Sequence, residues 1–309
     1  MNKIKLLNRI NKLYKDDNIN IIKYLKDIYN KKNNLLEDIM ISYDFQAGSY
    51  VEKFNKNKNF SYNYVKKLAN IINSLECNKT SIFEGGVGEA TTLVPLIENL
   101  KDNFKWVGGN DIAYSRIKIA QLFCGEHLKK NINLFMGDLF NIPIKDNSID
   151  VVYTSHSLEP NGGKEKELLE ELYRITRGYL ILLEPAYEFA NEEAKTRMIS
   201  HGYVTRLYET AKKMNLNIIS YELYGINSND LNPTGIMIIK KNIDNDYIED
   251  PICCPITHTN LEKLGNCYYS NDSMLAYPII NRVPCLTKDN AIVATKMKQF
   301  MLKEDEMLI

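Results

Sequence analysis

The chain has 309 residues, 44% of them hydrophobic, which is enough for one large domain with a buried core and a smaller domain beside it. Lysine plus arginine and aspartate plus glutamate number 39 each, so no strong charge excess points to nucleic acid or to a cationic partner. No apolar run approaches the roughly 18 residues of a membrane span, and the N-terminus lacks a signal-peptide core. We therefore expect a cytoplasmic protein without membrane contact, with nucleic acid disfavoured as a partner and the oligomeric state left open.

Residues 1–76 carry apolar side chains at helical spacing, as in Ile4, Leu7 and Ile10, and predict an N-terminal helical cap. Within it, residues 43–51 (YDFQAGSYV) contain a glycine and two tyrosines, which we interpret as a loop. Loops often carry binding residues, so Tyr50 is a candidate cofactor contact. Tyrosines in such a loop more often serve packing.

Residues 77–243 alternate apolar strands with amphipathic helices, a pattern typical of a mainly parallel sheet covered on both faces. The fold class is therefore α/β. The predicted strands are residues 81–84, 105–109, 132–136, 149–154, 179–183, 218–223 and 235–240.

The first predicted strand runs into a glycine-rich turn, SIFEGGVGEATTL, which a helix follows. Glycines permit tight backbone curvature and close approach of a ligand, and free N–H groups at a helix start favour anionic or polar groups. This indicates a nucleotide-type cofactor, although a dehydrogenase has a similar turn. The candidate cofactor contacts here are Glu84, Gly85, Gly86 and Gly88.

Acidic residues follow the next two predicted strands. Asp111 ends the second strand, where a carboxylate can accept both hydrogen bonds of a ribose diol. Asp138 follows a glycine after the third strand, and Leu139 can lie against an adenine ring. Either acid could instead cap a neighbouring helix or turn. A dehydrogenase would explain neither Asp138 nor the acidic strand end at Glu84.

Taken in order, residues 84–90, Asp111, residues 137–139 and residues 150–154 resemble the motifs of class I S-adenosyl-L-methionine-dependent methyltransferases. The resemblance spans roughly residues 43–241. It implies a Rossmann-like seven-stranded sheet whose last strand is antiparallel. It also implies that Glu84 and the glycine turn lie near the methionine moiety, Asp111 at the ribose and Asp138 at the adenine amine. Ala90 stands where the family commonly has glycine.

The segment after the fourth predicted strand, SHSLEPNGG, would then face the transferred methyl group and the substrate. His156 could remove a hydroxyl proton, since its ordinary pKa of about 6.5 suits a base near neutrality. Glu159 could orient His156 or bind substrate, and Asn161 offers both a donor and an acceptor. These are the candidate catalytic residues, although alignment of the reactants alone could suffice.

The fifth strand brings Glu184 to the same edge of the sheet, and the segment TRMISHGYVTR beyond it could cover the site. An arginine and a histidine there would suit a phosphate or carboxylate on the substrate. More often such residues form surface ion pairs. The candidate substrate residues are Glu184, Arg197, His201 and Tyr203.

Residues 250–309 form a further predicted unit, small and β-rich. Cys254, Cys267 and the residues 277–284 resemble the zinc-ribbon activator subunit of several tRNA, rRNA and release-factor methyltransferases. Thr257 and Ser270 stand where that family has its other two cysteines. Hydroxyls replace thiolates poorly on zinc, so we expect a degenerate ribbon-like domain and no metal.

The leading functional hypothesis is methyl transfer from S-adenosyl-L-methionine to an oxygen of a small polar molecule, such as a glycan or specialised-metabolite precursor. The alternative is an RNA or protein methyltransferase whose C-terminal ribbon-like domain acts as a built-in activator or binding module. A cofactor-binding scaffold without activity is the third possibility. The intact cofactor motifs disfavour it.

Overall fold

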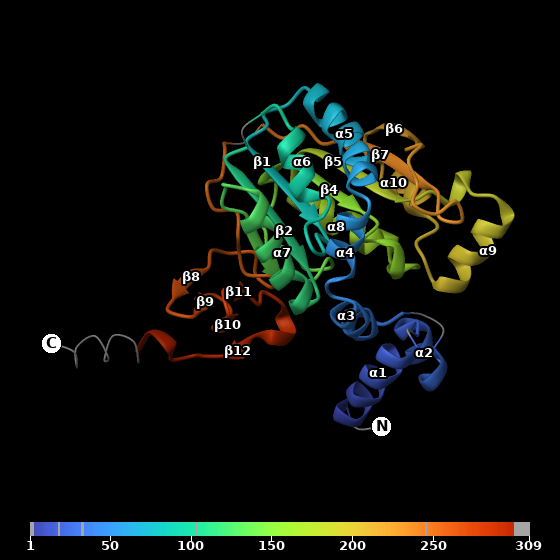
Figure 1. Ribbon diagram of the computed structural model, residues 1–309. Helices are drawn as coiled ribbons and strands as arrows, with labels where there is room; N and C mark the ends of the chain where they lie inside the picture. The colour runs from blue at the N-terminus through green and yellow to red at the C-terminus, as the bar shows by residue number, and fades with distance from the viewer. Residues whose placement is uncertain (1–2, 18, 32–33, 103, 245, 300–309) are drawn as a thin grey trace.

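The computed structural model describes residues 3–17, 19–31, 34–102, 104–244 and 246–299, and seven of its strands form one sheet (Figure 1). The order is β3-β2-β1-β4-β5-β7-β6. Strands β1 to β5 pair in parallel, whereas β7 is antiparallel to both of its neighbours, so the predicted sheet is confirmed. The strands are β1 (Ser81–Gly85), β2 (Trp106–Asp111), β3 (Asn133–Met136), β4 (Ile149–Ser155), β5 (Thr176–Pro185), β6 (Ile218–Leu223) and β7 (Thr234–Lys240).

Helices cover both faces of this sheet, because successive side chains of a strand point to opposite faces. Ile82 packs into the core formed with α5, α6 and α7, whereas Phe83 packs into the core formed with α8 and α10. The two helical layers are visible on either side of the sheet in Figure 1. The helices are α5 (Lys58–Ser74), α6 (Leu93–Asn99), α7 (Tyr114–His127), α8 (Glu165–Ile175) and α10 (Leu207–Lys213).

The N-terminal residues are helical, as predicted, and the first three helices share a small core around Ile10, Ile21, Leu25 and Ile41. The interpretation of residues 43–51 as a loop is wrong for most of that segment. Only residues 46–48 form a turn, and Gly48 has a φ of +101°. The remaining elements of this region are α1 (Lys3–Asp17), α2 (Ile21–Tyr29), α3 (Leu36–Phe45) and α4 (Ser49–Lys56).

Residues 250–299 form a second, antiparallel sheet that docks on the edge of β3. The N–H of Leu286 donates to the carbonyl of Met136 at 2.8 Å, and the N–H of Cys253 donates to the carbonyl of Pro143 at 2.9 Å. Tyr277 and Cys285 are buried in the two cores of the large sheet, so both sheets share one interior. The strands are β8 (Glu262–Leu264), β9 (Cys267–Ser270), β10 (Leu275–Ile280), β11 (Val283–Pro284) and β12 (Ile292–Val293).

The two cysteines of the ribbon resemblance have hydrogen-bond partners within this region. The thiol of Cys254 lies 3.3 Å from the hydroxyl of Tyr277, and the thiol of Cys267 donates to the carbonyl of Leu264 at 3.2 Å. In the described part of the chain, no three His, Cys, Asp or Glu side chains are grouped to hold a metal ion. The predicted resemblance of residues 250–309 to a zinc ribbon is therefore not confirmed by the structure. None of the described helices is long and apolar enough to cross a membrane.

Candidate active site

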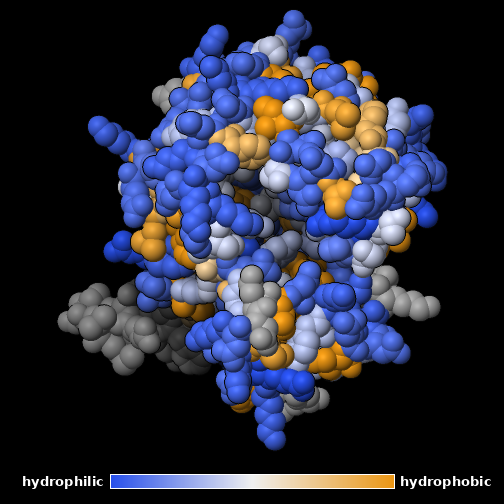
Figure 2. All heavy atoms as spheres, turned by 45° about the vertical axis from the view of Figure 1, so that its right-hand side comes forward, coloured by the Kyte–Doolittle hydropathy of each residue, from blue (hydrophilic) through white to orange (hydrophobic). Residues whose placement is uncertain are grey.

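A cavity of about 420 Å³ opens at the carboxyl ends of β1, β2 and β4. The helices α3, α4 and α9 (Glu192–His201), the start of α7, the turn after β3 and the segment before β7 supply further parts of its wall. The face turned forward in Figure 2 is hollowed near its centre and is mostly hydrophilic. Ligands of open α/β sheets bind outside the carboxyl ends of the strands, so this cavity is the candidate active site.

The glycine turn after β1 forms the floor of the cavity. Gly86 and Gly88 have φ values of +71° and +55°, and Ala90 has a φ of +61° although it is not a glycine. A Cβ atom at Gly86 would lie 2.2 Å from the Cβ of Ser157, so only glycine fits there. The turn thus keeps bare backbone beside the cavity, which leaves room for a ligand to approach closely.

Glu84 lies at the end of β1 and is 2% exposed. The hydroxyl of Tyr153 donates to its Oε2 at 2.8 Å. Burial raises the pKa of Glu84 to about 8, although the bond from Tyr153 opposes the rise. A cation bound beside this buried carboxyl would favour its ionised form and lower its pKa.

Asp111 and Asp138 line the same cavity and also hold their own loops. Asp111 accepts hydrogen bonds from the N–H groups of Gly88 (3.1 Å) and Ala113 (2.8 Å), and Asp138 accepts one from Phe140 (2.9 Å). Burial raises the pKa of both carboxyls. Each carboxylate oxygen has a further lone pair, so the structural bonds leave both acids able to accept bonds from a ligand.

The N-terminal cap is fixed to the glycine turn by Glu89. This buried side chain accepts hydrogen bonds from the N–H groups of Gly48, Tyr50 and Val51 at 2.7–3.0 Å. A carboxylate at a helix start satisfies N–H groups that have no partner within the helix, which explains why α4 begins at Ser49. The same contacts place the ring of Tyr50 3.4 Å from the position of a Cβ at Gly88.

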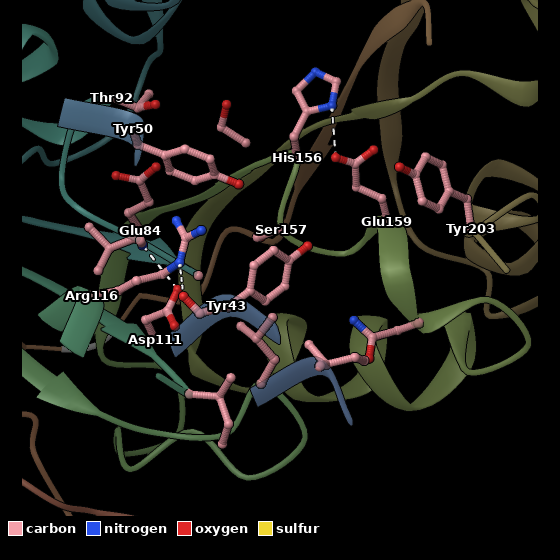
Figure 3. A pocket seen from close by; sticks show the side chains of 18 of the residues that line it. Tyr43, Tyr50, Glu84, Thr92, Asp111, Arg116, His156, Ser157, Glu159 and Tyr203 are labelled. Atoms are coloured by element: carbon pink, nitrogen blue, oxygen red, sulfur yellow. Dashed lines mark hydrogen bonds and ion pairs between the residues drawn. The ribbon is translucent and has the colours of Figure 1, made fainter. Parts of the chain in front are cut away.

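His156 and Glu159 lie on the other side of the cavity, as Figure 3 shows. His156 has a φ of +53°, its Nε2 is 2.8 Å from the hydroxyl of Thr234, and its Nδ1 is 3.6 Å from Glu159 Oε1. Burial alone would lower the pKa of His156, but the hydrogen bond and charge of Glu159 outweigh it, and the pKa is raised. Both ring nitrogens thus have partners within the protein.

The end of the cavity near Glu159 is polar. Asn161, Arg197, Tyr203 and Asn232 line it, and Asn232 donates to Glu159 Oε2 at 2.8 Å. Two buried atoms there, Arg197 Nη1 and Asn232 Oδ1, have no hydrogen-bond partner among the described residues. Buried polar atoms are usually paired, so these two are available to a substrate.

Three predicted site residues lie outside the cavity wall. Gly85 faces the core, where an added Cβ would be 3.1 Å from Leu172. Glu184 is buried behind the wall and accepts bonds from the N–H groups of Ser157 and Leu158. His201 bonds through Nδ1 to the carbonyl of Arg197, 2.8 Å away. In this geometry Glu184 and His201 position the segments that carry other site residues.

The structure also adds wall residues that the sequence analysis did not single out. Tyr43, Arg116 and Asn232 all line the cavity. Arg116 follows Asp111 by five residues and lies in the first turn of α7, so its nearness in sequence to a predicted site acid was a usable signal. Asn232 had no such signal, because its place depends on how the segment before β7 folds back.

Residues 85–182 match the family Methyltransf_11, described as a methyltransferase domain. The matched segment runs from the end of β1 to β5 and includes the glycine turn, Asp111, Asp138 and His156. This protein therefore carries a methyltransferase domain and is an enzyme. Its cofactor is S-adenosyl-L-methionine.

Several solved structures are similar to this chain. A candidate S-adenosyl-L-methionine-dependent methyltransferase from Methanococcus maripaludis is 19% identical over 67% of this chain and 96% of its own, with a TM-score of 0.47. A complex of the Haloferax volcanii Trm112 methyltransferase activator with a candidate methyltransferase is 13% identical over 67% of this chain and 100% of its own, with a TM-score of 0.49. A candidate methyltransferase from Bacillus halodurans is 13% identical over 58% of this chain and 99% of its own, with a TM-score of 0.45. No curated protein sequence matches the chain.

The cavity fits this cofactor in two respects. The bare backbone at Gly86 and Gly88 leaves space that side chains would fill. The buried acids Glu84 and Asp138 and the half-buried Asp111 suit hydroxyls and positively charged groups.

Proposed function

We propose that the protein transfers the methyl group to an oxygen atom of a small polar molecule. The observation that carries this proposal is the shared cavity, which brings His156 and Glu159 opposite the acids of β1 and β2. When bound, S-adenosyl-L-methionine supplies a methyl group on a positively charged sulfur that an acceptor oxygen can displace. The task left to the chain is to hold the acceptor in line and to accept its proton.

Cofactor binding is assigned to the residues of the first three strand ends. Asp111 would bind the ribose hydroxyls, and Asp138 with Leu139 would hold the adenine. Gly86, Gly88 and Tyr50 would enclose the methionine moiety, with Glu84 toward its amino group. All of these side chains or backbone positions lie on the cavity wall, which supports the assignment.

Glu159 is the better placed proton acceptor. His156 has partners at both ring nitrogens, and its raised pKa favours the imidazolium form, which cannot accept a further proton. A carboxylate can accept further bonds beyond those from His156 and Asn232. This assignment moves the base from His156, as the sequence suggested, to its neighbour, with His156 as the orienting residue.

The size of the acceptor is limited by the cavity, whose volume is about 420 Å³. Asn34 donates to the carbonyls of Pro160 (2.8 Å) and His201 (3.1 Å), so the segment before α3 joins the loop after β4 to the end of α9. A small molecule suits a cavity of this size better than a folded macromolecule. Arg197 Nη1 would donate to a carboxylate or another oxygen group of the acceptor molecule, and Asn232 Oδ1 would accept from a donor group of the same molecule. Asn161 and Tyr203 line the cavity beside them.

The test is a transfer assay with methyl-labelled S-adenosyl-L-methionine against matched small hydroxyl, carboxyl and amine compounds, bulk RNA and bulk protein. We expect label in hydroxyl or carboxyl compounds, with an O-methyl product identified by NMR. Label in RNA, in protein or on nitrogen would refute the proposed acceptor.

With an acceptor in hand, Glu159→Gln should lower turnover by about 10²- to 10⁴-fold, the range for a general base. The affinity for S-adenosylhomocysteine should stay within about twofold, since Glu159 faces the acceptor end. Glu209→Gln is the matched control, because Glu209 forms a surface ion pair with Lys213 and should leave turnover unchanged. Equal turnover of wild type and Glu159→Gln would exclude the base role.

A further inference from the structure

Arg116 is a buried cation directly over the glycine turn. It lies in the first turn of α7, and its side chain is 1% exposed. A Cβ atom at Gly88 would be 3.7 Å from Arg116 Nη1. The guanidinium therefore faces the part of the cavity where the backbone is bare.

Its neighbours hold this guanidinium in one orientation. The Nε donates to the carbonyl of Tyr43 at 3.0 Å, and Nη1 lies 3.6 Å from Glu89 Oε1. The guanidinium carbon is 3.9 Å from the ring centre of Tyr50 and 4.9 Å from that of Tyr43. Figure 3 shows the side chain between these two rings. A fork fixed in this way loses little conformational freedom when it binds a ligand.

The remaining nitrogen, Nη2, is buried and has no hydrogen-bond partner in the described ranges. Glu89 is only a partial counter-charge, because its two oxygens already accept three backbone N–H bonds. A charged donor left in this state is unfavourable unless a ligand completes it. The missing partner must be an acceptor that enters the cavity.

The charges of the cofactor identify that acceptor. Its sulfonium and amino groups are cationic, its ribose and adenine are neutral, and its carboxylate is its one anionic group. Glu84 and Asp111, also on this side, suit the cationic and hydroxyl groups. We propose that Arg116 binds the carboxylate of the cofactor's methionine moiety and thereby selects cofactors that carry it. Arginine matches a carboxylate with two parallel N–H bonds, which makes this pairing specific.

The test compares S-adenosylhomocysteine with its decarboxylated form, S-adenosyl-3-thiopropylamine, by isothermal titration calorimetry. Wild type should prefer the carboxylate-bearing ligand by about 10- to 100-fold, the scale of a hydrogen-bonded charge pair. Arg116→Met should abolish this preference by weakening S-adenosylhomocysteine alone. Methionine retains a long apolar side chain between the tyrosine rings.

Two further variants separate this role from others. Lys53→Met removes an exposed cation that also lines the cavity, with its Nζ 5.8 Å from the ring centre of Tyr50, and should leave the preference intact. Arg116→Lys keeps the positive charge but lacks the planar guanidinium, so it should retain a reduced preference for S-adenosylhomocysteine over the decarboxylated ligand. This variant tests the role of Arg116 if Arg116→Met does not fold.

Three outcomes would overturn the proposal. The first is equal affinity of wild type for both ligands. The second is an equal loss for both ligands in the Arg116 variants, because a purely structural role would weaken them alike. The third is loss of the preference in Lys53→Met. Failure of wild type to bind S-adenosylhomocysteine at all would refute the cofactor itself, and the role of Arg116 with it.

Discussion

Gly86→Ala should damage the cofactor loop more than any other single methyl addition in the glycine turn. The backbone of Gly86 has a φ of +71°, and an alanine in that region costs about 1–2 kcal/mol. The new Cβ would also lie 2.2 Å from the Cβ of Ser157 and 2.8 Å from its hydroxyl. Ser157 would have to move, and overpacking of this kind adds about 1–3 kcal/mol. We expect a total loss of about 2–5 kcal/mol in the free energy of unfolding.

Two matched variants separate the two contributions. Gly88→Ala has a similar φ, +55°, but its Cβ would meet the ring of Tyr50 and Arg116 Nη1 at ordinary distances of 3.4 and 3.7 Å. It should therefore lose about 1–2 kcal/mol, the conformational part alone. In a Gly86→Ala background, Ser157→Gly removes the colliding atom and should recover the overpacking part. The Ser157→Gly single variant gives the baseline, since it also loses the hydroxyl bond to the carbonyl of Gly85.

The assay is urea unfolding of the four variants, with S-adenosylhomocysteine titrated into each by calorimetry. Affinity should fall with stability in Gly86→Ala, because the colliding loop forms the cavity floor. Equal destabilisation by Gly86→Ala and Gly88→Ala would refute the reasoning. So would a double variant that is no more stable than expected from adding the two single effects.

Two other predictions concern the strand-end acids. Asp111→Asn should weaken S-adenosylhomocysteine by about 5- to 150-fold, the scale for losing a charged hydrogen-bond partner, and an unchanged affinity in a calorimetric titration would contradict the ribose assignment. Burial holds the pKa of Glu84 at about 8 in the cofactor-free protein, well above its ordinary value of 4.5, so the folded state binds more protons between these values. The contribution of Glu84 to stability is therefore full below about pH 4.5 and is lost as the pH rises through about 8, whereas affinity for the cationic cofactor should rise over the same interval. Glu84→Gln should flatten both pH profiles, and profiles that match wild type would show that Glu84 does not titrate there.

The sheet and one side of the cavity could be predicted from the sequence because both depend on local patterns. A short apolar run predicts a buried strand, and parallel strands end at a common edge. Acids that end such runs, as Glu84 and Asp111 do, must therefore lie near one another. The resemblance to methyltransferases depended on the same ordered strand ends.

The other side of the cavity depends on contacts between distant segments. Asn34 reaches the carbonyl of Pro160, 126 residues away, and no pattern near either residue indicates this bond. The residues around Tyr50 were misjudged for a related reason. Composition indicated a loop, but Glu89, 39 residues away, supplies the acceptor that allows a helix to begin there.

The direction of a side chain at a strand end also could not be known. Glu184 comes at the end of β5, where parallel strands bring acids together, yet it faces away from the cavity and holds the backbone of Ser157. Side chains alternate between the two faces of a strand, so a shift of one residue reverses such an assignment. The apolar run indicated where Glu184 lies along the strand, but not to which face of the sheet its side chain points.

The edge of β3 has a further consequence, which follows from its pairing with Leu286 of the same chain. An open strand edge presents unpaired N–H and C=O groups and readily recruits strands from other molecules. Here the second sheet, which carries Leu286, begins after residue 250 and is joined to β7 by the short stretch of residues 241–250. Its effective concentration at the β3 edge is therefore on the order of millimolar. Dilution does not separate the two surfaces, and a competing protein must reach a similar local concentration to displace the segment. The β3 edge is thereby reserved for this chain's own C-terminal region.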